Sequence, residues 1–263
     1  MGLKRKIRVL LDSEERLRSA FERQRRKCNE QRSFPLTPEG LLRGLDPRKL
    51  DEIRSPLSNP DPGEYTVKYL ETEKWLLPNI RRVLNIGLDF KRNQRVLDLG
   101  SGAGYFLYIC KQLGHDPMGL DVPDPGAAWY GKMFELYGVP RVIWYINPFE
   151  PLPDLGARFD YVTGFMICFN QPKSEHPWGN KEWGFFLDDL KTHLKPHGVV
   201  WFELNPGLDG AHYTPELKRF FESRGAIVDG KRLVWGLDER SYRILQQEGK
   251  REAAAVRKSL VTT

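Results

Sequence analysis

The stretch Val96-Leu97-Asp98-Leu99-Gly100-Ser101-Gly102-Ala103-Gly104-Tyr105-Phe106 decides the fold of this chain. A short apolar segment runs into three alternating glycines, and a second apolar segment follows at once. Glycine lets the backbone turn sharply and approach a ligand without a Cβ in the way. The first turn of a helix then offers unpaired N–H groups to an electron-rich ligand. The stretch therefore predicts a strand, a ligand-binding loop and a helix, in that order.

Strand and helix patterns alternate on both sides of this loop. We predict strands at 95–99, 117–121, 141–146, 159–165 and 198–204, with two more near 226–236 and 240–246. We predict helices at 12–32, 64–88, 103–113, 127–137 and 181–194, and another that Thr214 caps. Alternation of this kind favours an α/β fold, a seven-stranded, mostly parallel sheet with helices on both faces.

The segment before the sheet is basic and rich in short helix signals. Thr37-Pro38 and Asp46-Pro47 each place a capping residue before a proline, which is typical of a helix start. The proline-rich run from Ser55 to Gly63 cannot be regular structure and predicts a linker. We therefore expect a basic helical extension over 1–63 that could act as a lid, an α/β domain over 64–246 and a polar tail over 247–263.

The net charge of +6 is unevenly spread along the chain. Residues 1–50 hold 14 Lys/Arg and 7 Asp/Glu, whereas the remaining residues hold 27 and 28. Three hypotheses compete for the basic helix at 12–32: a solvated helix packed through Leu10, Leu17 and Phe21, adhesion to an anionic membrane, or contact with nucleic acid. The first is preferred. Nucleic acid is not favoured as a partner, since the predicted catalytic domain is near neutral.

Sequence features that report on cellular location favour the cytoplasm. No apolar run approaches the roughly 18–20 residues that span a membrane. The N-terminus lacks an apolar signal core and carries acids, which argues against both secretion and a transit peptide. Cys28, Cys110 and Cys168 lie far apart without zinc spacing, so reduced thiols are expected and no metal site is predicted.

The loop chemistry distinguishes between ligands. The glycines form a GxGxG pattern, and Asp98 stands two residues before the first of them. An acid there is unfavourable beside a pyrophosphate but suits a cationic ligand. The pattern resembles the first motif of class I methyltransferases, which bind S-adenosylmethionine on a Rossmann-like fold. The resemblance implies that Gly100, Ser101, Gly102 and Gly104 cradle the amino-acid part of the cofactor, and that Asp98 helps to hold its ammonium group.

Three further elements are similar to this family. Gly119-Leu120-Asp121 ends the second predicted strand, and an acid there accepts hydrogen bonds from ribose hydroxyls. Ile146–Pro153 places Asn147 where the family usually has an acid that faces adenine, and Phe149 could either stack on the base or lie in the core. Leu190–Val200 resembles a helix-turn-strand motif in which His197 replaces a glycine, so we predict a turn residue there. Val122 and Phe165 complete the predicted cofactor-binding set.

The acceptor would bind beyond the carboxyl ends of the fourth and fifth strands. The candidate substrate contacts there are Asn170, Trp178, Asn205, His212 and Tyr213. A hydroxyl acceptor needs a general base near neutral pKa, and we predict His176 for that role, with His212 second. The resemblance thus implies a methyltransferase, and the leading hypothesis for its acceptor is a hydroxyl of a small molecule or glycan.

Two other functions stay open at this point. One is a catalytically inert protein that keeps the fold and recruits partners through its basic N-terminal arm. The other is an NAD-dependent oxidoreductase, because Asp121 suits a dinucleotide fold as well. Titration with S-adenosylmethionine and with NAD separates the three.

Overall fold

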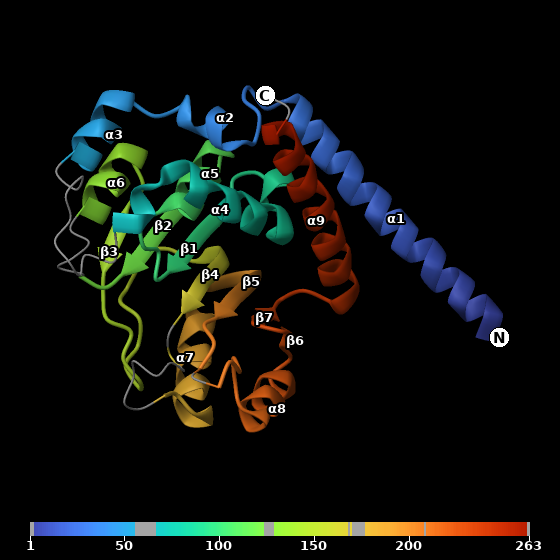
Figure 1. Ribbon diagram of the computed structural model, residues 1–263. Helices are drawn as coiled ribbons and strands as arrows, with labels where there is room; N and C mark the ends of the chain where they lie inside the picture. Colours follow the sequence, from blue (N-terminus) through green and yellow to red (C-terminus); the bar gives the residue numbers. More distant parts are fainter. Residues whose placement is uncertain are drawn as a thin grey trace. The chain divides into compact units, whose positions relative to one another are not determined.

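A computed structural model describes residues 3–55, 67–123, 129–167, 169, 177–207 and 209–261 of the chain. These fall into two compact units, each assembled from separate parts of the sequence (Figure 1). The first, called here the helical unit, comprises Met1–Leu45, Glu71–Arg92 and Asp238–Thr263. The second, called the sheet unit, comprises Asp46–Leu70 and Asn93–Leu237. The predicted boundaries after residues 63 and 246 stay predictions.

The sheet unit is built on a seven-stranded sheet. Its strands are β1 (Arg95–Leu99), β2 (Asp116–Asp121), β3 (Arg141–Ile143), β4 (Phe159–Ile167), β5 (Leu194–Leu204), β6 (Ile227–Asp229) and β7 (Arg232–Trp235). They follow the order β3-β2-β1-β4-β5-β7-β6. The pairings among β1 to β5 are parallel, whereas β7 runs antiparallel to both β5 and β6. The expected α/β class and strand number are confirmed, but the expectation of a mostly parallel sheet is corrected to a mixed one.

The reason for the mixed sheet lies in residues 226–236. This segment was predicted as one strand, yet it contains Gly230, which adopts a φ of 55° and turns the chain between β6 and β7. Strands joined by so short a turn can pair only antiparallel. The segment therefore supplies two strands, and β7 enters the sheet beside β5 in the reverse direction.

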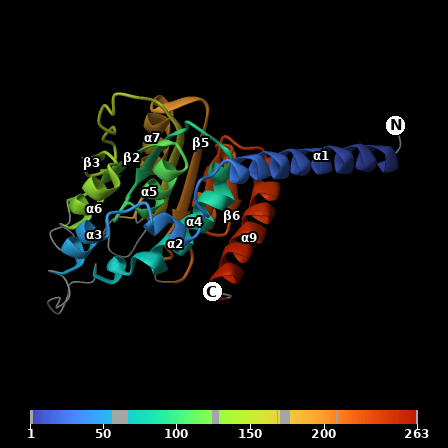
Figure 2. The same ribbon diagram turned by 90° about the horizontal axis from the view of Figure 1, so that it is seen from above.

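Helices cover both faces of this sheet (Figure 2). They are α5 (Tyr105–Gln112), α6 (Trp129–Tyr137), α7 (Asn180–Thr192) and α8 (Pro215–Ser223), with α3 (Pro47–Arg54) and the short 3₁₀ turn η2 (Val67–Leu70) at the periphery. Residues of α7 and α8, among them Trp183 and Phe221, are fully buried in one cluster with Leu97 and Phe202 of the strands. On the other face Phe106 of α5 packs edge-on against Phe165 of β4. Because parallel strands place their carboxyl ends together, the loops after β1, β2, β4 and β5 share one edge.

The helical unit contains α1 (Leu3–Glu30), α2 (Pro38–Leu42), α4 (Thr72–Ile86), the 3₁₀ turn η3 (Leu88–Phe90) and α9 (Glu239–Val261). The predicted strand at 240–246 is wrong, because these residues begin α9. The Asp238 carboxylate accepts hydrogen bonds from the backbone N–H and the hydroxyl of Ser241, which fixes the first turn of that helix. At Gly249, α9 crosses α4 so closely that a Cβ would lie 2.5 Å from Oδ1 of Asn85.

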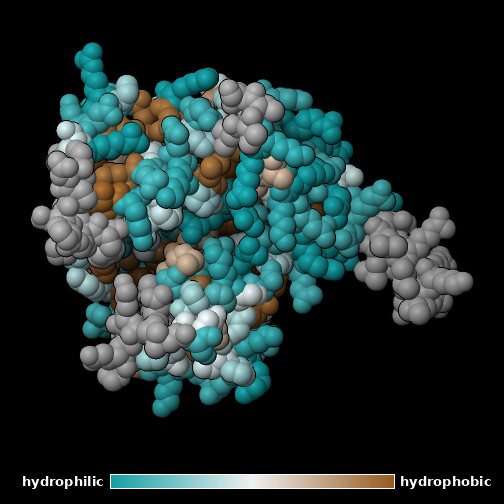
Figure 3. Space-filling view, viewed as in Figure 1, coloured by the Kyte–Doolittle hydropathy of each residue, from teal (hydrophilic) through white to brown (hydrophobic). Residues whose placement is uncertain are grey.

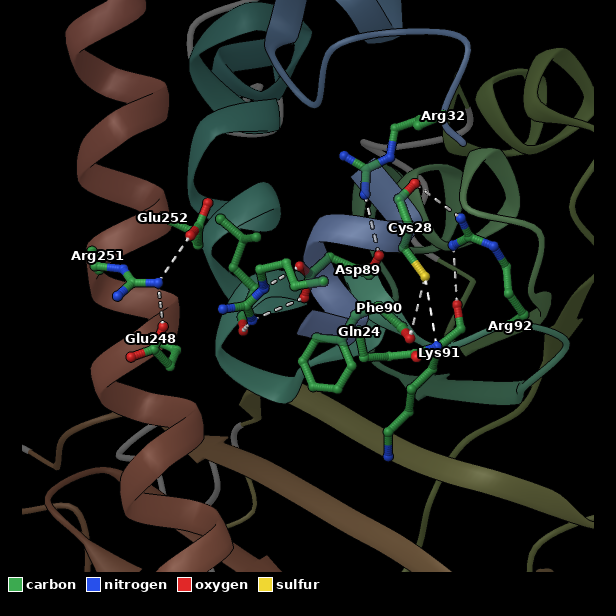
Figure 4. Close-up of polar contacts among 12 residues, drawn as sticks. Gln24, Cys28, Arg32, Asp89, Phe90, Lys91, Arg92, Glu248, Arg251 and Glu252 are labelled. Carbon is green, nitrogen blue, oxygen red and sulfur yellow. Dashed lines mark hydrogen bonds and ion pairs between the residues drawn. The ribbon is translucent and has the colours of Figure 1, made fainter. Parts of the chain in front are cut away.

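Polar contacts hold the helical unit together (Figure 4). The guanidinium of Arg25 donates to both carboxylate oxygens of Asp89, at 2.5 and 3.2 Å, and both side chains are almost completely buried. Arg32 donates to the backbone oxygen of Asp89 at 3.1 Å. On α9, Arg251 pairs with Glu248 and Glu252. Among the residues that the structure describes, no helix combines the length and apolar composition needed to cross a bilayer.

Candidate functional site

The glycine-rich loop joins β1 to α5. Gly100, Gly102 and Gly104 have φ values of 68°, 52° and 76°, in the left-handed region that favours glycine. A Cβ built on Gly100 or Gly102 meets no described atom within 4 Å, whereas one on Gly104 would lie 2.8 Å from the ring of Phe134. The first two glycines therefore face open space, and the third allows α5 and α6 to pack.

Asp121 ends β2 and closes this loop from the neighbouring strand. Its Oδ2 accepts the backbone N–H of Gly102 at 2.6 Å, and its Oδ1 accepts the N–H of Val122 at 2.9 Å. An ionised carboxylate can accept about four hydrogen bonds, so Asp121 can hold the loop and also bind hydroxyl groups of a ligand. The structure thus brings together two motifs that the sequence places 19 residues apart.

Ser101 supplies a polar group at the same place. Its Oγ is buried and has no hydrogen-bond partner among the described residues. A Cβ on Gly119 would lie 2.7 Å from this Oγ and 2.7 Å from the ring of Phe134, so β2 needs glycine there. A buried hydroxyl without a partner costs about 1–3 kcal/mol, which a bound polar ligand would offset. The open glycines, this hydroxyl and the Asp121 carboxylate together fit a ligand that carries hydroxyl and charged groups.

Arg141 lies near Asp121, and no sequence signal pointed to it. β3 pairs Arg141 with Gly119, so the long side chain extends over a position without a side chain. Its guanidinium lies over the rings of Phe134 and Tyr130, at 5.5 and 5.9 Å from their centroids. Nη2 donates to the Val122 carbonyl at 3.4 Å and lies 3.9 Å from Oδ2 of Asp121. Arg141 therefore places a positive charge near the same Asp121 oxygen that accepts the Gly102 N–H.

Replacing Arg141 by Met should weaken ligand binding at Asp121 by roughly 3- to 10-fold, since a partly buried ion pair contributes about 1 kcal/mol. Calorimetric titration with S-adenosylhomocysteine measures the change. Arg95→Met is the matched control, because Arg95 pairs with Asp116 at the exposed amino ends of β1 and β2. Equal affinities of the two variants would show that Arg141 does not act on the site.

Asp98 lies just before the loop and is deeply buried, at 3% exposure. Its Oδ1 accepts the hydroxyl hydrogen of Thr163 on β4 at 2.7 Å. Burial raises the pKa of the nearby Cys110 thiol well above its usual value, and the Asp98 carboxylate adds to that rise. Cys110 is therefore a protonated core residue. The predicted contact of Asp98 with an ammonium group stays a prediction.

The remaining predicted cofactor-binding residues, Asn147 and Phe149 on the adenine side together with Val122 and Phe165, lie in different environments. The Asn147 amide donates to Glu150 at 2.9 Å. Phe149 is 53% exposed, so the alternative that it is a core residue is wrong. Val122 is also exposed, whereas Phe165 is buried against Phe106. Roles for these four residues in cofactor binding stay predictions.

The predicted acceptor residues occupy different environments. Trp178 is buried in an aromatic cluster, stacked on Phe169 with ring centroids 4.0 Å apart. Tyr213 donates its hydroxyl to the Gly230 carbonyl, and burial together with Asp229 and Glu222 raises its pKa, so its phenol is protonated at neutral pH. His212 is half-buried beside it. His176 and Asn170, the predicted base and one predicted substrate contact, lie outside the described residues.

Asn205 uses its side chain on the backbone of the neighbouring strand. Its amide nitrogen donates to the carbonyl of Met166 at 2.6 Å. Met166 lies in a bulge at the end of β4, with a φ of 62° and a side chain that is 40% exposed. Left-handed backbone at a residue other than glycine is concentrated at functional sites. The sequence does not predict this conformation at Met166, since its neighbours carry no turn signal.

Comparisons with known proteins identify remote structural neighbours. No protein-family model matches this chain, and no curated protein matches its sequence. One similar solved structure is a ribosomal protein L11 methylase from Lactobacillus delbrueckii subsp. bulgaricus, with a TM-score of 0.39 and 15% identity, covering 59% of this chain and 74% of that one.

Two other similar structures have comparable scores. DesVI of Streptomyces venezuelae has a TM-score of 0.41 and 18% identity, and the match covers 55% of this chain and 57% of that one. CalS10, an amino pentose methyltransferase from Micromonospora echinaspora, has a TM-score of 0.37 and 21% identity, with coverage of 53% and 51%. Similarity this remote does not specify an activity for this chain.

Proposed function

We propose that this chain is an S-adenosylmethionine-dependent methyltransferase of class I, acting on a hydroxyl of a small molecule or glycan. The observation that carries the proposal is the loop at Gly100–Gly104, which is open toward solvent at two glycines and tied by the Gly102 N–H to the Asp121 carboxylate. Asp98 at the strand end favours a ligand with a positive charge over the pyrophosphate of NAD, since an anionic group beside that carboxylate would be repelled.

The chain's own residues would bind and orient this cofactor. Gly100 and Gly102 provide room for its amino-acid part, and Ser101 offers a hydroxyl that has no other described partner. Asp121 would accept hydrogen bonds from the ribose hydroxyls, held in place by Gly102 and Arg141. The bound cofactor would supply an already activated methyl group, so the protein's main tasks are to position the acceptor and to exclude water.

Deprotonation of a hydroxyl acceptor would fall to His176. A histidine has an ordinary pKa near neutrality, which suits a general base. His176 lies in the sequence between β4 and α7. Trp178, two positions further along the chain, donates its backbone N–H to the carbonyl of Phe169. An acceptor would bind at the carboxyl edge of the sheet, where β4 ends.

Calorimetric titration of the full chain with S-adenosylmethionine, S-adenosylhomocysteine and NAD tests the cofactor assignment. We expect the first two to bind and NAD not to bind. Binding of NAD alone would favour an oxidoreductase. Binding of none of the three compounds would favour a catalytically inert protein that keeps the fold. Incorporation of labelled methyl groups across a panel of small hydroxyl compounds and glycans then tests the acceptor.

Asp121→Ala should weaken binding of S-adenosylhomocysteine by about 10- to 100-fold, because charge-assisted hydrogen bonds contribute about 1.5–3 kcal/mol. Asp160→Ala is a suitable control, since that carboxylate lies at the amino end of β4 and pairs with Lys195. Unchanged affinity in Asp121→Ala would remove the assignment of Asp121 to the ribose.

A further inference from the structure

Positive charge is concentrated in the helical unit, whose basic residues come from three separate segments of the chain. That unit holds 23 Lys/Arg and 13 Asp/Glu over 93 residues, a net of +10, while the sheet unit holds 18 and 22, a net of −4. The basic character therefore extends beyond the N-terminal segment to the residues of α4 and α9. Sixteen of the 23 cationic residues are arginines, whose forked guanidinium matches the geometry of phosphate.

Part of this charge is used inside the unit. Arg25 pairs with Asp89, Arg18 with Glu248, and Arg251 with Glu22. A second group of cationic side chains is exposed and has neither a hydrogen bond nor an ion pair with any described residue. They are Arg16, Arg23, Arg26 and Lys27 on α1, Arg81 on α4, and Arg243, Lys250 and Arg257 on α9.

The spacing of these free cations forms stripes. Arg243, Lys250 and Arg257 follow one another at intervals of seven residues on α9, as Arg16 and Arg23 do on α1. Seven residues are close to two helical turns, so each stripe lies on one face with charges about 10 Å apart. A linear polyanion can contact several such charges at once, whereas a small anion can contact only one or two.

The face of the helical unit that Figure 3 shows is hydrophilic. Where its side chains are coloured, the face of α1 and α9 seen in Figure 3 is almost wholly teal. The large hydrophobic side chains that are well exposed in the described chain, such as Trp144, Tyr145 and Phe149, belong to the sheet unit. A helix that lies in a membrane interface needs an apolar face to insert, so an anionic bilayer is the weaker partner.

We propose that the helical unit binds the phosphate backbone of double-stranded nucleic acid, without reading its sequence. The arginine-rich stripes on α1 and α9 provide the contacts, and binding displaces the counterions condensed on the phosphates. This function is separate from methyl transfer and does not require nucleic acid to be the methyl acceptor.

Fluorescence anisotropy of the full chain tests the proposal, with a labelled RNA duplex and the DNA duplex of the same sequence. We expect at least one duplex to bind, with log affinity falling against log salt at about −0.9 per phosphate contact. Arg243→Gln/Lys250→Gln/Arg257→Gln should weaken that binding about 10- to 100-fold and make the slope shallower by about 3.

A matched control removes the same charge from the sheet unit. Lys132, Lys181 and Arg219 are exposed and have no partner among the described residues, so their triple replacement by Gln should leave affinity within about 3-fold. The proposal is overturned if neither duplex binds the parent chain, if the control loses as much affinity as the α9 variant, or if vesicles with phosphatidylserine bind in place of both duplexes. Helix content measured by circular dichroism shows whether the variants are folded. The salt dependence of the duplex affinity of the parent chain tests the proposal without any variant.

Discussion

Gly102→Val is expected to abolish binding of S-adenosylmethionine and S-adenosylhomocysteine, with a loss of at least about 1,000-fold. A β-branched residue at a φ of 52° is strongly strained, and its side chain would project into the open space that the glycines leave. Strain of this kind amounts to about 1–3 kcal/mol, and steric exclusion of the ligand adds to it. Displacement of the Gly102 N–H would also free the Asp121 carboxylate from its fixed position.

Gly156→Val distinguishes loss of the site from loss of the fold. Gly156 has a φ of 65° and, as at Gly102, a Cβ added there would meet no described atom within 4 Å, but it lies in the connection between β3 and β4. We expect this variant to lose stability similarly and to bind the cofactor like the parent chain. Calorimetric titration measures the cofactor affinity of both variants, and thermal unfolding measures their stability. Tight binding by Gly102→Val would contradict the proposed cofactor site.

Arg25→Met is expected to destabilise the helical unit by about 3–5 kcal/mol. The substitution leaves the Asp89 carboxylate buried at 1% exposure without its counter-charge. Arg25→Met/Asp89→Leu should recover most of the loss, because a buried ion pair and an apolar pair of similar volume often have similar stability. Urea unfolding followed by helix content measures all three chains.

The pH dependence of the single variant provides a second measurement. Burial raises the pKa of the Asp89 carboxyl, and the Arg25 guanidinium opposes that rise. Without Arg25 the native state binds a proton more readily than the unfolded state, so the unfolding free energy of Arg25→Met should increase as the pH is lowered toward about 5.

Lys74→Met is the control variant. It removes an exposed pair with Glu71 in the same unit and should change stability by less than about 1 kcal/mol. Equal stability of the two variants would rule out a structural role for the buried pair.

Local elements could be predicted from the sequence wherever the determining residues are neighbours. The strand, glycine loop and helix at 95–112 lie where they were expected, since the glycines and the apolar runs on either side act within one turn of chain. Thr37, Asp46 and Thr214 cap helices as expected, each through its own side chain. His197 was predicted as a turn residue but lies within β5, in the irregular part between the pairings of Leu194 and Val199. Its φ of 65° is the left-handed conformation expected of the glycine that it replaces.

Elements whose form depends on distant residues were predicted less well. Residues 240–246 were predicted as a strand, but α9 forms there because its face packs on α4 around Gly249. The antiparallel entry of β7 also depends on pairing with β5, some 30 residues earlier in the chain. A periodic pattern does not specify which partner will bury it.

The sequence alone thus determined the α/β class, the glycine loop, Asp121 and the net charge. The first three depend on patterns of residues that are close together in the sequence, and the net charge depends only on composition. Only the tertiary structure decided that Asp121 accepts a hydrogen bond from Gly102 and that Arg141 lies near its carboxylate. It also decided that Arg25 pairs with Asp89 across 64 positions, and that the free cations gather in one helical unit. These arrangements follow from strand register and helix crossing. Strand register and helix crossing are both set by the burial of apolar faces between segments that are remote in the chain. A local sequence pattern does not identify the remote segment against which a face will pack.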